Sequence, residues 1–162
     1  MAALIREDEV VTAISPEKMF KVFVLEDSVI IPKIIPVIKS IEIIEGNGGP
    51  GTIKKTTFVT TFVEGSEVKY VKNRIDAIDK DNFIYNYTTF EGALWNDTIE
   101  KVSYEIKLVS APNGGSIVKS IGKYYAKGDA KIDEEVIKAG EQQILAMFKV
   151  IETYLLANPD AY

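Results

Sequence analysis

The stretch that decides the fold is residues 99–126, IEKVSYEIKLVSAPNGGSIVKSIGKYYA. From Ile99 to Val109, apolar side chains alternate with lysine, serine and glutamate, which is the period of a β-strand with one buried face. The tripeptide Asn113-Gly114-Gly115 is a turn signal, and the segment Ser116–Ala126 is again suited to an extended strand. The stretch therefore predicts an antiparallel hairpin. The apolar positions of its first strand are Val102, Tyr104, Ile106 and Leu108.

Upstream of this hairpin, turn signals separate short segments that are rich in β-branched and aromatic residues. Because short turns join consecutive strands, we expect an antiparallel meander with one solvated and one buried face. The turns are residues 46–51, 64–66 and 79–82, and the segments include 41–45, 52–61 and 82–90.

The N-terminal part predicts one strand followed by short helices. Residues Glu7–Ile14 contain β-branched residues and are typical of a strand. Ser15-Pro16-Glu17 then marks a helix start, with a capping hydroxyl, proline in the first turn and a carboxylate near the positive helix end. Pro32 and Pro36 divide the following segment into short helical or irregular pieces.

The C-terminal part predicts one long helix. Asp133 can cap it, Glu134 and Glu135 lie in its first turn, and Asn158-Pro159 stops it. Its apolar stripe is broad, so the helix must lie across another apolar surface, for which the inner face of the sheet is the best partner. The expected fold is α+β, a curved antiparallel sheet around one helix with a possible hollow between them.

Composition excludes several kinds of site. The chain has 162 residues, which is the size of one domain, and contains neither histidine nor cysteine. Disulfides, zinc sites of the Cys/His kind, a cysteine nucleophile and a Ser-His-Asp triad are therefore excluded. The net charge of -5 disfavours a nucleic-acid partner, because phosphate binding needs concentrated lysine and arginine.

The sequence shows no clear signal peptide and no membrane-spanning segment. Arg6, Glu7, Asp8 and Glu9 interrupt the region where a signal peptide needs an apolar core. The longest apolar region, residues 29–44, is broken by prolines and lysines and is too short to span a bilayer. We therefore expect a cytosolic protein with no membrane partner.

Two motifs have both a structural and a functional interpretation. The segment Asn82–Phe90 places Phe83, Tyr85, Tyr87 and Thr89 on one face, where the rings serve either core packing or ligand orientation in an apolar pocket. The loop Glu45–Thr52 is rich in glycine but lacks the Gly-Lys-Ser/Thr ending of a phosphate loop. It is followed by a β-rich segment, so a rigid β-turn is the better interpretation.

Acid–base candidates are limited to carboxylates, lysine and tyrosine. Glu100 has the same parity as Val102 and Tyr104, which predicts an inward direction if the strand is regular. Glu152 lies two residues before Tyr154 on the final helix. A ribonuclease built from these groups needs a tuned carboxylate pair in place of imidazoles. Exposed carboxylates on a helix and a strand are the commoner explanation.

Several segments, in the same order along the chain, resemble those of the plant pathogenesis-related class 10 proteins, the relatives of the birch pollen major allergen. The resemblance extends from end to end. It is carried by Glu45–Thr52, Tyr70–Arg74, Asn82–Tyr87, Asn113–Ser116, Lys127–Asp129 and Tyr154–Pro159.

The resemblance implies a helix-grip fold in one domain, residues 1–162. In this fold a seven-stranded antiparallel curved sheet wraps around the long C-terminal helix, and two short helices lie between the first two strands. It also implies a large internal cavity for small amphipathic plant metabolites such as flavonoids, cytokinins or steroids. By the same resemblance we expect an intracellular defence-related monomer and allergen without a cofactor or metal.

The resemblance also assigns site residues by position. Lys54 and Tyr85 are the preferred anchors for a ligand oxygen. Where the sequence departs from the family pattern, Trp95, in the loop after Glu91-Gly92, is a candidate wall or lid for a flat ligand. Ser120 and Gly122 are small and predicted to face inward, which leaves the cavity roomy. The expected ligand-binding set is Asp8, Phe23, Ile38, Lys54, Phe58, Tyr70, Phe83, Tyr85, Tyr87, Trp95, Val102, Tyr104, Ile106, Gln143 and Met147. For the alternative function, a weak ribonuclease, the matching residues are Lys54, Glu100, Glu152 and Tyr154.

Overall fold

A computed structural model describes residues 3–36, 38–58, 69–92, 98–132 and 134–160. These residues contain three α-helices, one short π-helical segment and seven strands. In chain order the elements are β1 (Ala3–Thr12), α1 (Pro16–Phe20), η1 (Lys21–Leu25), α2 (Asp27–Ile34), β2 (Ile38–Glu45), β3 (Ile53–Phe58), β4 (Lys69–Asp79), β5 (Ile84–Gly92), β6 (Ile99–Ser110), β7 (Ser116–Ala126) and α3 (Glu134–Ala157).

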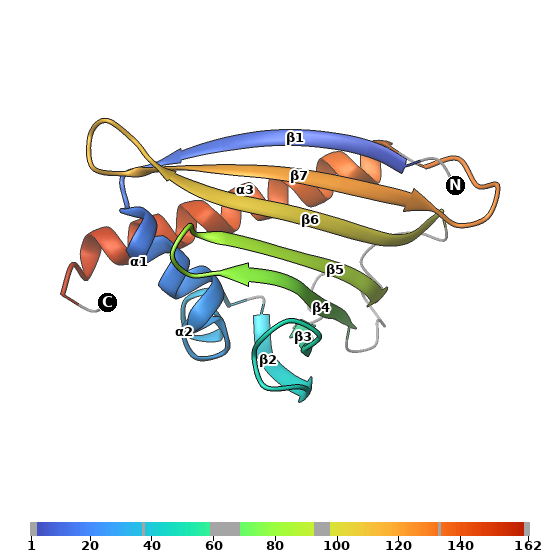
Figure 1. The fold of residues 1–162 in the computed structure, drawn as a ribbon, viewed down its shortest axis with the longest axis horizontal. Helices are drawn as coiled ribbons and strands as arrows, with labels where there is room; N and C mark the ends of the chain where they lie inside the picture. The colour runs from blue at the N-terminus through green and yellow to red at the C-terminus, as the bar shows by residue number, and fades with distance from the viewer. Residues whose placement is uncertain (1–2, 37, 59–68, 93–97, 133, 161–162) are drawn as a thin grey trace.

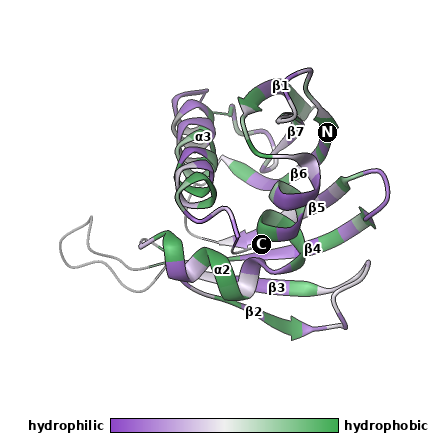
Figure 2. Cartoon of the chain, turned by 90° about the vertical axis from the view of Figure 1, so that its left-hand side faces the viewer, coloured by the Kyte–Doolittle hydropathy of each residue, from purple (hydrophilic) through white to green (hydrophobic). Residues whose placement is uncertain are grey.

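The seven strands form one antiparallel sheet in the order β1-β7-β6-β5-β4-β3-β2. Consecutive strands from β2 to β7 are neighbours, and β1 closes the order by pairing with β7. Seen end-on, the strands describe an arc whose concave side faces α3 and α2 (Figure 2). The helix α3 runs along the long strands β1, β7 and β6, and the short helices lie near its C-terminal end (Figure 1). The expected helix-grip arrangement is confirmed.

The β6–β7 hairpin follows the alternation of the sequence. Val102, Ile106 and Leu108 are buried, and β6 pairs with β7 in continuous register from Lys101 to Ser110. Between Ile99 and Lys101 the register shifts, so the alternation of inward and outward side chains does not extend through Glu100. At the other end, a Cβ on Gly115 would lie 2.2 Å from the carbonyl oxygen of Thr12, so the turn packs directly on the end of β1.

Between β1 and β2 the chain forms a compact helical segment. The Ser15 hydroxyl accepts a hydrogen bond from the Lys18 amide at 3.4 Å, which is the predicted N-cap. The turn widens in η1, where the Glu26 amide donates to the Lys21 carbonyl five residues earlier at 2.8 Å. Met19, Phe20 and Val22 are almost fully buried, so this segment plugs one end of the sheet.

The core has two parts that meet α3 at different places. The larger part surrounds Phe148, Ile151 and Leu155 in the C-terminal half of α3, and the smaller part surrounds Ile137 near its beginning. α3 ends at Ala157, where both the amide and the side chain of Asn158 donate to the Tyr154 carbonyl oxygen. Between the two parts, the middle of α3 passes over the sheet without filling the space beneath it.

Candidate functional site

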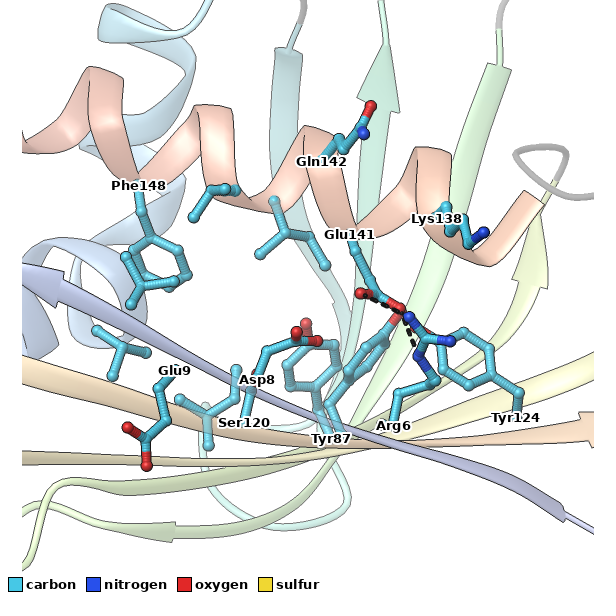
Figure 3. A pocket seen from close by; sticks show the side chains of 17 residues that line it. Arg6, Asp8, Glu9, Tyr87, Ser120, Tyr124, Lys138, Glu141, Gln142 and Phe148 are labelled. Atoms are coloured by element: carbon cyan, nitrogen blue, oxygen red, sulfur yellow. Dashed lines mark hydrogen bonds and ion pairs between the residues drawn. The ribbon is translucent and has the colours of Figure 1, made fainter. Parts of the chain in front are cut away.

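A cavity of about 240 Å³ lies between the middle of α3 and the inner face of the sheet (Figure 3). Four strands form its floor, and α3 forms its roof. The side chains that face it are mostly apolar or aromatic, with charged groups at the edge beside β1. They include Arg6, Asp8, Val10, Tyr87, Tyr104, Ile106, Val118, Ser120, Tyr124, Glu141, Ile144 and Phe148.

The strand register explains why there is room beneath α3. Arg6 on β1 is opposite Gly122 on β7, Gly122 is opposite Tyr104 on β6, and Tyr104 is opposite Tyr87 on β5. Since directly opposed residues share a face, these positions form one row across the inner side of the sheet. Gly122 has no side chain, and its neighbour in the next inward position, Ser120, is small. The space above these two residues is therefore left open.

Tyrosine rings form a continuous ladder along the floor. Ring centroids are 5.1 Å apart for Tyr85 and Tyr87 and 5.0 Å apart for Tyr87 and Tyr104. Tyr104 then meets Tyr124 edge-on at 6.2 Å. Burial raises the pKa of the Tyr87 and Tyr104 hydroxyls far above their usual value. These hydroxyls therefore stay protonated at neutral pH and act as neutral hydrogen-bonding groups.

An ion pair joins the edge strand to the helix at the mouth of the cavity. The Nε of Arg6 lies 3.0 Å from Oε1 of Glu141, and a second guanidinium nitrogen lies 3.5 Å from Oε2. Both side chains are partly buried. The carboxylate of Asp8, next along the inner side of β1, points into the cavity, whereas that of Glu9 points away (Figure 3).

The opposite end of the interior is closed by packing. Phe23 stacks on Phe148 with ring centroids 4.9 Å apart, and Tyr85 is only 6% exposed. The Nζ of Lys54 lies 2.8 and 3.0 Å from the two carboxylate oxygens of Asp27. Burial raises the pKa of Asp27, and the Lys54 ammonium opposes that rise. Lys54 is thus held by Asp27, and it is not among the residues that line the cavity beneath α3.

The predicted ligand-binding residues therefore separate into groups. Asp8, Tyr87, Tyr104 and Ile106 face the cavity. Phe83 precedes β5 with a φ of 56° and packs on Phe20. Trp95 lies outside the described residues, as does the side chain of Gln143. Ile106 is also a core residue, and Tyr87 and Tyr104 pack against the core. The other predicted residues that belong to the core or pack against it are Phe23, Ile38, Phe58, Phe83, Tyr85, Val102 and Met147.

The inward position expected for Tyr70 is wrong. Its neighbour Val71 is buried, so Tyr70 has the opposite parity and lies on the outer face of the sheet. There its hydroxyl donates to Oε2 of Glu91 at 2.7 Å, and the Nζ of Lys55 lies 4.7 Å from the ring centroid. The cavity that the described residues line measures about 240 Å³, and side chains of the core fill the end beside α1 and α2.

Sequence reasoning missed several residues of the cavity. On α3 the lining positions 141, 144 and 148 follow helical spacing, and this stripe is a usable signal. Glu141 itself carries a charge, so an apolar pattern does not find it. On β1 the missed residues are Arg6 and Val10, which flank the predicted Asp8 and continue the parity of Thr12, which is buried. That signal was hidden because two of the three inward residues are charged.

The four residues of the ribonuclease alternative do not converge. Oε2 of Glu152 accepts a hydrogen bond from the Ala13 amide at 3.1 Å, just beyond the end of β1. Glu100 is exposed, and it falls in the register shift at the opposite end of the strands, where Ile99 pairs with Ala126. The strand β6, with 12 residues, spans roughly 40 Å. The predicted inward direction of Glu100 is thus overturned by a bulge.

The glycine-rich loop uses its backbone amides internally. Gly48 donates to the Thr52 hydroxyl at 2.8 Å, and Gly51 donates to the Ile75 carbonyl at 2.7 Å. Thr52 donates to the Gly49 carbonyl at 3.1 Å. These amides are not directed at an external anion, which agrees with the interpretation of the loop as a rigid turn.

Two kinds of feature are absent from the described residues. Within the described ranges, no group of three or more histidine, cysteine, aspartate or glutamate residues is arranged to hold a metal ion. No helix in the described part of the chain is long and apolar enough to cross a membrane.

Comparison with known proteins gives a consistent answer over nearly the whole chain. Residues 3–158 match the model of the "Pathogenesis-related protein Bet v 1 family". Major allergen Pru ar 1 of Prunus armeniaca is 52% identical, covering 100% of this chain and 99% of the relative. Major allergen Mal d 1 of Malus domestica is 54% identical, covering 96% of each.

Among solved structures, that of Ara h 8.0201 superposes with a TM-score of 0.85 at 41% identity, covering 96% of this chain and 99% of the other. The shared sheet, the shared α3 and the match from residue 3 to residue 158 lead to one conclusion. The chain belongs to the Bet v 1 family of pathogenesis-related proteins.

Proposed function

We propose that the protein reversibly binds small amphipathic plant metabolites, of the flavonoid, cytokinin or steroid kind, in the cavity beneath α3. The single observation that supports this most strongly is an apolar cavity floored by Tyr87, Tyr104 and Tyr124. Aromatic walls with a few polar groups at one side are typical of sites that orient a small ligand. We place this activity in the cytoplasm, with the protein acting as a monomeric carrier.

Cavity size restricts the ligand. About 240 Å³ is slightly below the range of roughly 300–1,000 Å³ that is usual for ligand pockets. Flat ligands of one to three rings therefore fit better than a steroid, unless the helix moves away from the sheet. Among the three classes, this favours the cytokinin and flavonoid kinds.

The test is displacement of a fluorescent apolar probe, with a variant that fills the cavity. Ser120→Leu places a larger side chain on the inner face of β7, whereas Lys119→Leu introduces the same residue on its outer face. We expect micromolar probe binding to the wild-type protein, displacement by phenolic or hormone-like plant metabolites, and at least about tenfold weaker binding by Ser120→Leu.

The control variant Lys119→Leu should bind the probe as the wild-type protein does. Thermal unfolding of both variants checks that they fold. If Ser120→Leu binds the probe as tightly as the wild-type protein does, the cavity is not the binding site. If neither a probe nor a metabolite binds the wild-type protein at micromolar concentration, the proposed function is wrong.

A further inference from the structure

The charged residues around the cavity mouth are unevenly paired. Arg6 forms an ion pair with Glu141, whose Oε1 lies 3.0 Å from the Nε of Arg6. The Nζ of Lys138 lies 3.7 Å from Oε1 of Glu135. Asp8 points into the cavity from the inner face of β1, opposite Ser120 (Figure 3). Among the described residues no cation is paired with this carboxylate. The mouth therefore offers one open negative group, while its cations are already paired.

The floor beside Asp8 is also favourable to positive charge. The rings of Tyr87, Tyr104 and Tyr124 line the cavity, and the face of a phenol ring attracts a cation. Burial is the main reason why the pKa values of Tyr104 and Tyr124 are raised. Glu141 adds to the rise at both tyrosines and Asp8 adds to it at Tyr124, where Arg6 acts in the opposite direction. The negative potential of the two carboxylates thus extends to the hydroxyl ends of the ladder.

Three kinds of polar group on an otherwise equal aromatic ligand would meet different surroundings here. A carboxylate would approach Asp8 and would compete with Glu141 for Arg6. An alcohol can donate one hydrogen bond to the Asp8 carboxylate, but it brings no positive charge. A protonated amine brings N–H donors to an acceptor carboxylate and positive charge to ring faces.

We propose that this cavity selects flat aromatic ligands that carry a protonated amine, with Asp8 as the residue that receives the ammonium group. This selectivity rests on the proposed ligand-binding function and narrows its ligand class. Asp8 lies on an edge strand and is exposed toward the mouth, so the ammonium group stays near solvent. The aromatic ring enters the space above Ser120 and Gly122.

The experiment compares three ligands with one ring system: 2-(2-naphthyl)ethylamine, 2-(2-naphthyl)ethanol and 2-naphthylacetic acid. Calorimetric titration at pH 7 and low salt gives the dissociation constant of each. We expect the amine to bind about fivefold more tightly than the alcohol, which is the scale of a partly solvated ion pair combined with a cation–π contact. The acid should bind more weakly than the alcohol.

Two matched variants locate the effect. Asp8→Asn should bring the affinity for the amine to within about twofold of the affinity for the alcohol. Glu7→Gln removes the same charge from the outer face of β1, one residue away, and should keep the preference. Asp8→Ser repeats the test with a different side chain, and thermal unfolding monitors the fold of all three variants.

The outcomes separate the two proposals. Equal binding of all three ligands by the wild-type protein would leave the binding function standing and overturn the amine preference. The same follows if the acid binds best or if Glu7→Gln loses the preference as Asp8→Asn does. Failure of every ligand to bind would count against the proposed function itself, and the amine preference would fall with it.

Discussion

Lys54 and Asp27 form an ion pair in almost dry surroundings, with side chains only 9% and 14% exposed. Removing one partner leaves the other charge buried and unpaired, which typically costs about 3–5 kcal/mol. We therefore expect Lys54→Met to lower the free energy of unfolding by that amount, as measured by chemical denaturation.

The double variant Lys54→Met, Asp27→Leu serves as the control for that experiment. It removes both charges together, so no unpaired group remains, and most of the lost stability should return. If the double variant is as unstable as the single one, packing around the lysine stem is responsible and the ion pair is not.

Gly115 is a second position where a small change has a large expected effect. Its missing Cβ would lie 2.2 Å from the Thr12 carbonyl oxygen, so an alanine forces the turn and the end of β1 apart. We expect Gly115→Ala to destabilise the protein by about 1–3 kcal/mol in thermal unfolding. Gly49→Ala is the matched control, because its nearest contact is an ordinary 3.4 Å from the Asn47 side chain. A similar loss in both variants would contradict the steric explanation.

At the scale of elements, Glu152 fastens α3 to the segment between β1 and α1. Its carboxylate accepts hydrogen bonds from the Thr12 side chain and the Ala13 amide, and these bonds lower the pKa of Glu152 below its ordinary value of 4.5. A carboxyl group with a lowered pKa in the folded state stabilises the fold above its unfolded pKa. That contribution is lost as the pH falls through the folded pKa.

We therefore predict that Glu152→Gln lowers the melting temperature at pH 6 and has a smaller effect near pH 3. The measurement is thermal unfolding of the variant and the wild-type protein across this range. Glu134→Gln, an exposed position in the first turn of α3, is the reference variant. A constant difference at all pH values would assign the effect to hydrogen-bond geometry and not to charge.

Element boundaries show what the sequence could predict and where it could not. The strand Ser116–Ala126 matches β7 over its whole length, because the strong turn signal Asn113-Gly114-Gly115 precedes it. The strand expected at Glu7–Ile14 instead spans Ala3–Thr12, since its inward side contains Arg6 and Asp8 and alternation alone does not find charged residues that face a cavity. The π-helical turn at Lys21–Leu25 cannot be predicted from the helical spacing of apolar residues.

A shift in strand register explains why the predicted direction of Glu100 was wrong. Period-two reasoning assumes regular pairing, but the β6–β7 ladder shifts beside Ile99, which turns Glu100 outward. Phe23 and Tyr85 are apolar and inward, as expected, but whether an inward ring lines a cavity or fills the core depends on its partners in space. Such partners are set by tertiary packing.

At the scale of the whole molecule, the separation of Glu100 from Glu152 bears on RNA cleavage. The two carboxylates lie at opposite ends of the long strands and share no site. We predict that the rate of RNA loss is the same for the wild-type protein and for Glu100→Gln, Glu152→Gln, prepared in parallel under ribonuclease-free conditions. A large drop in the double variant would establish an intrinsic activity.

The pairing of β1 with β7 has a consequence for how the chain acquires its structure. Ala3 finds its partner in Tyr125, near the other end of the sequence. During synthesis the first strand must therefore wait, unpaired, until most of the chain has left the ribosome. Sheets closed by such distant pairings typically fold in milliseconds to seconds, because loop closure precedes the stabilising contacts. The edge that carries Asp8 and frames the cavity mouth is thus expected to be among the last parts of the molecule to form.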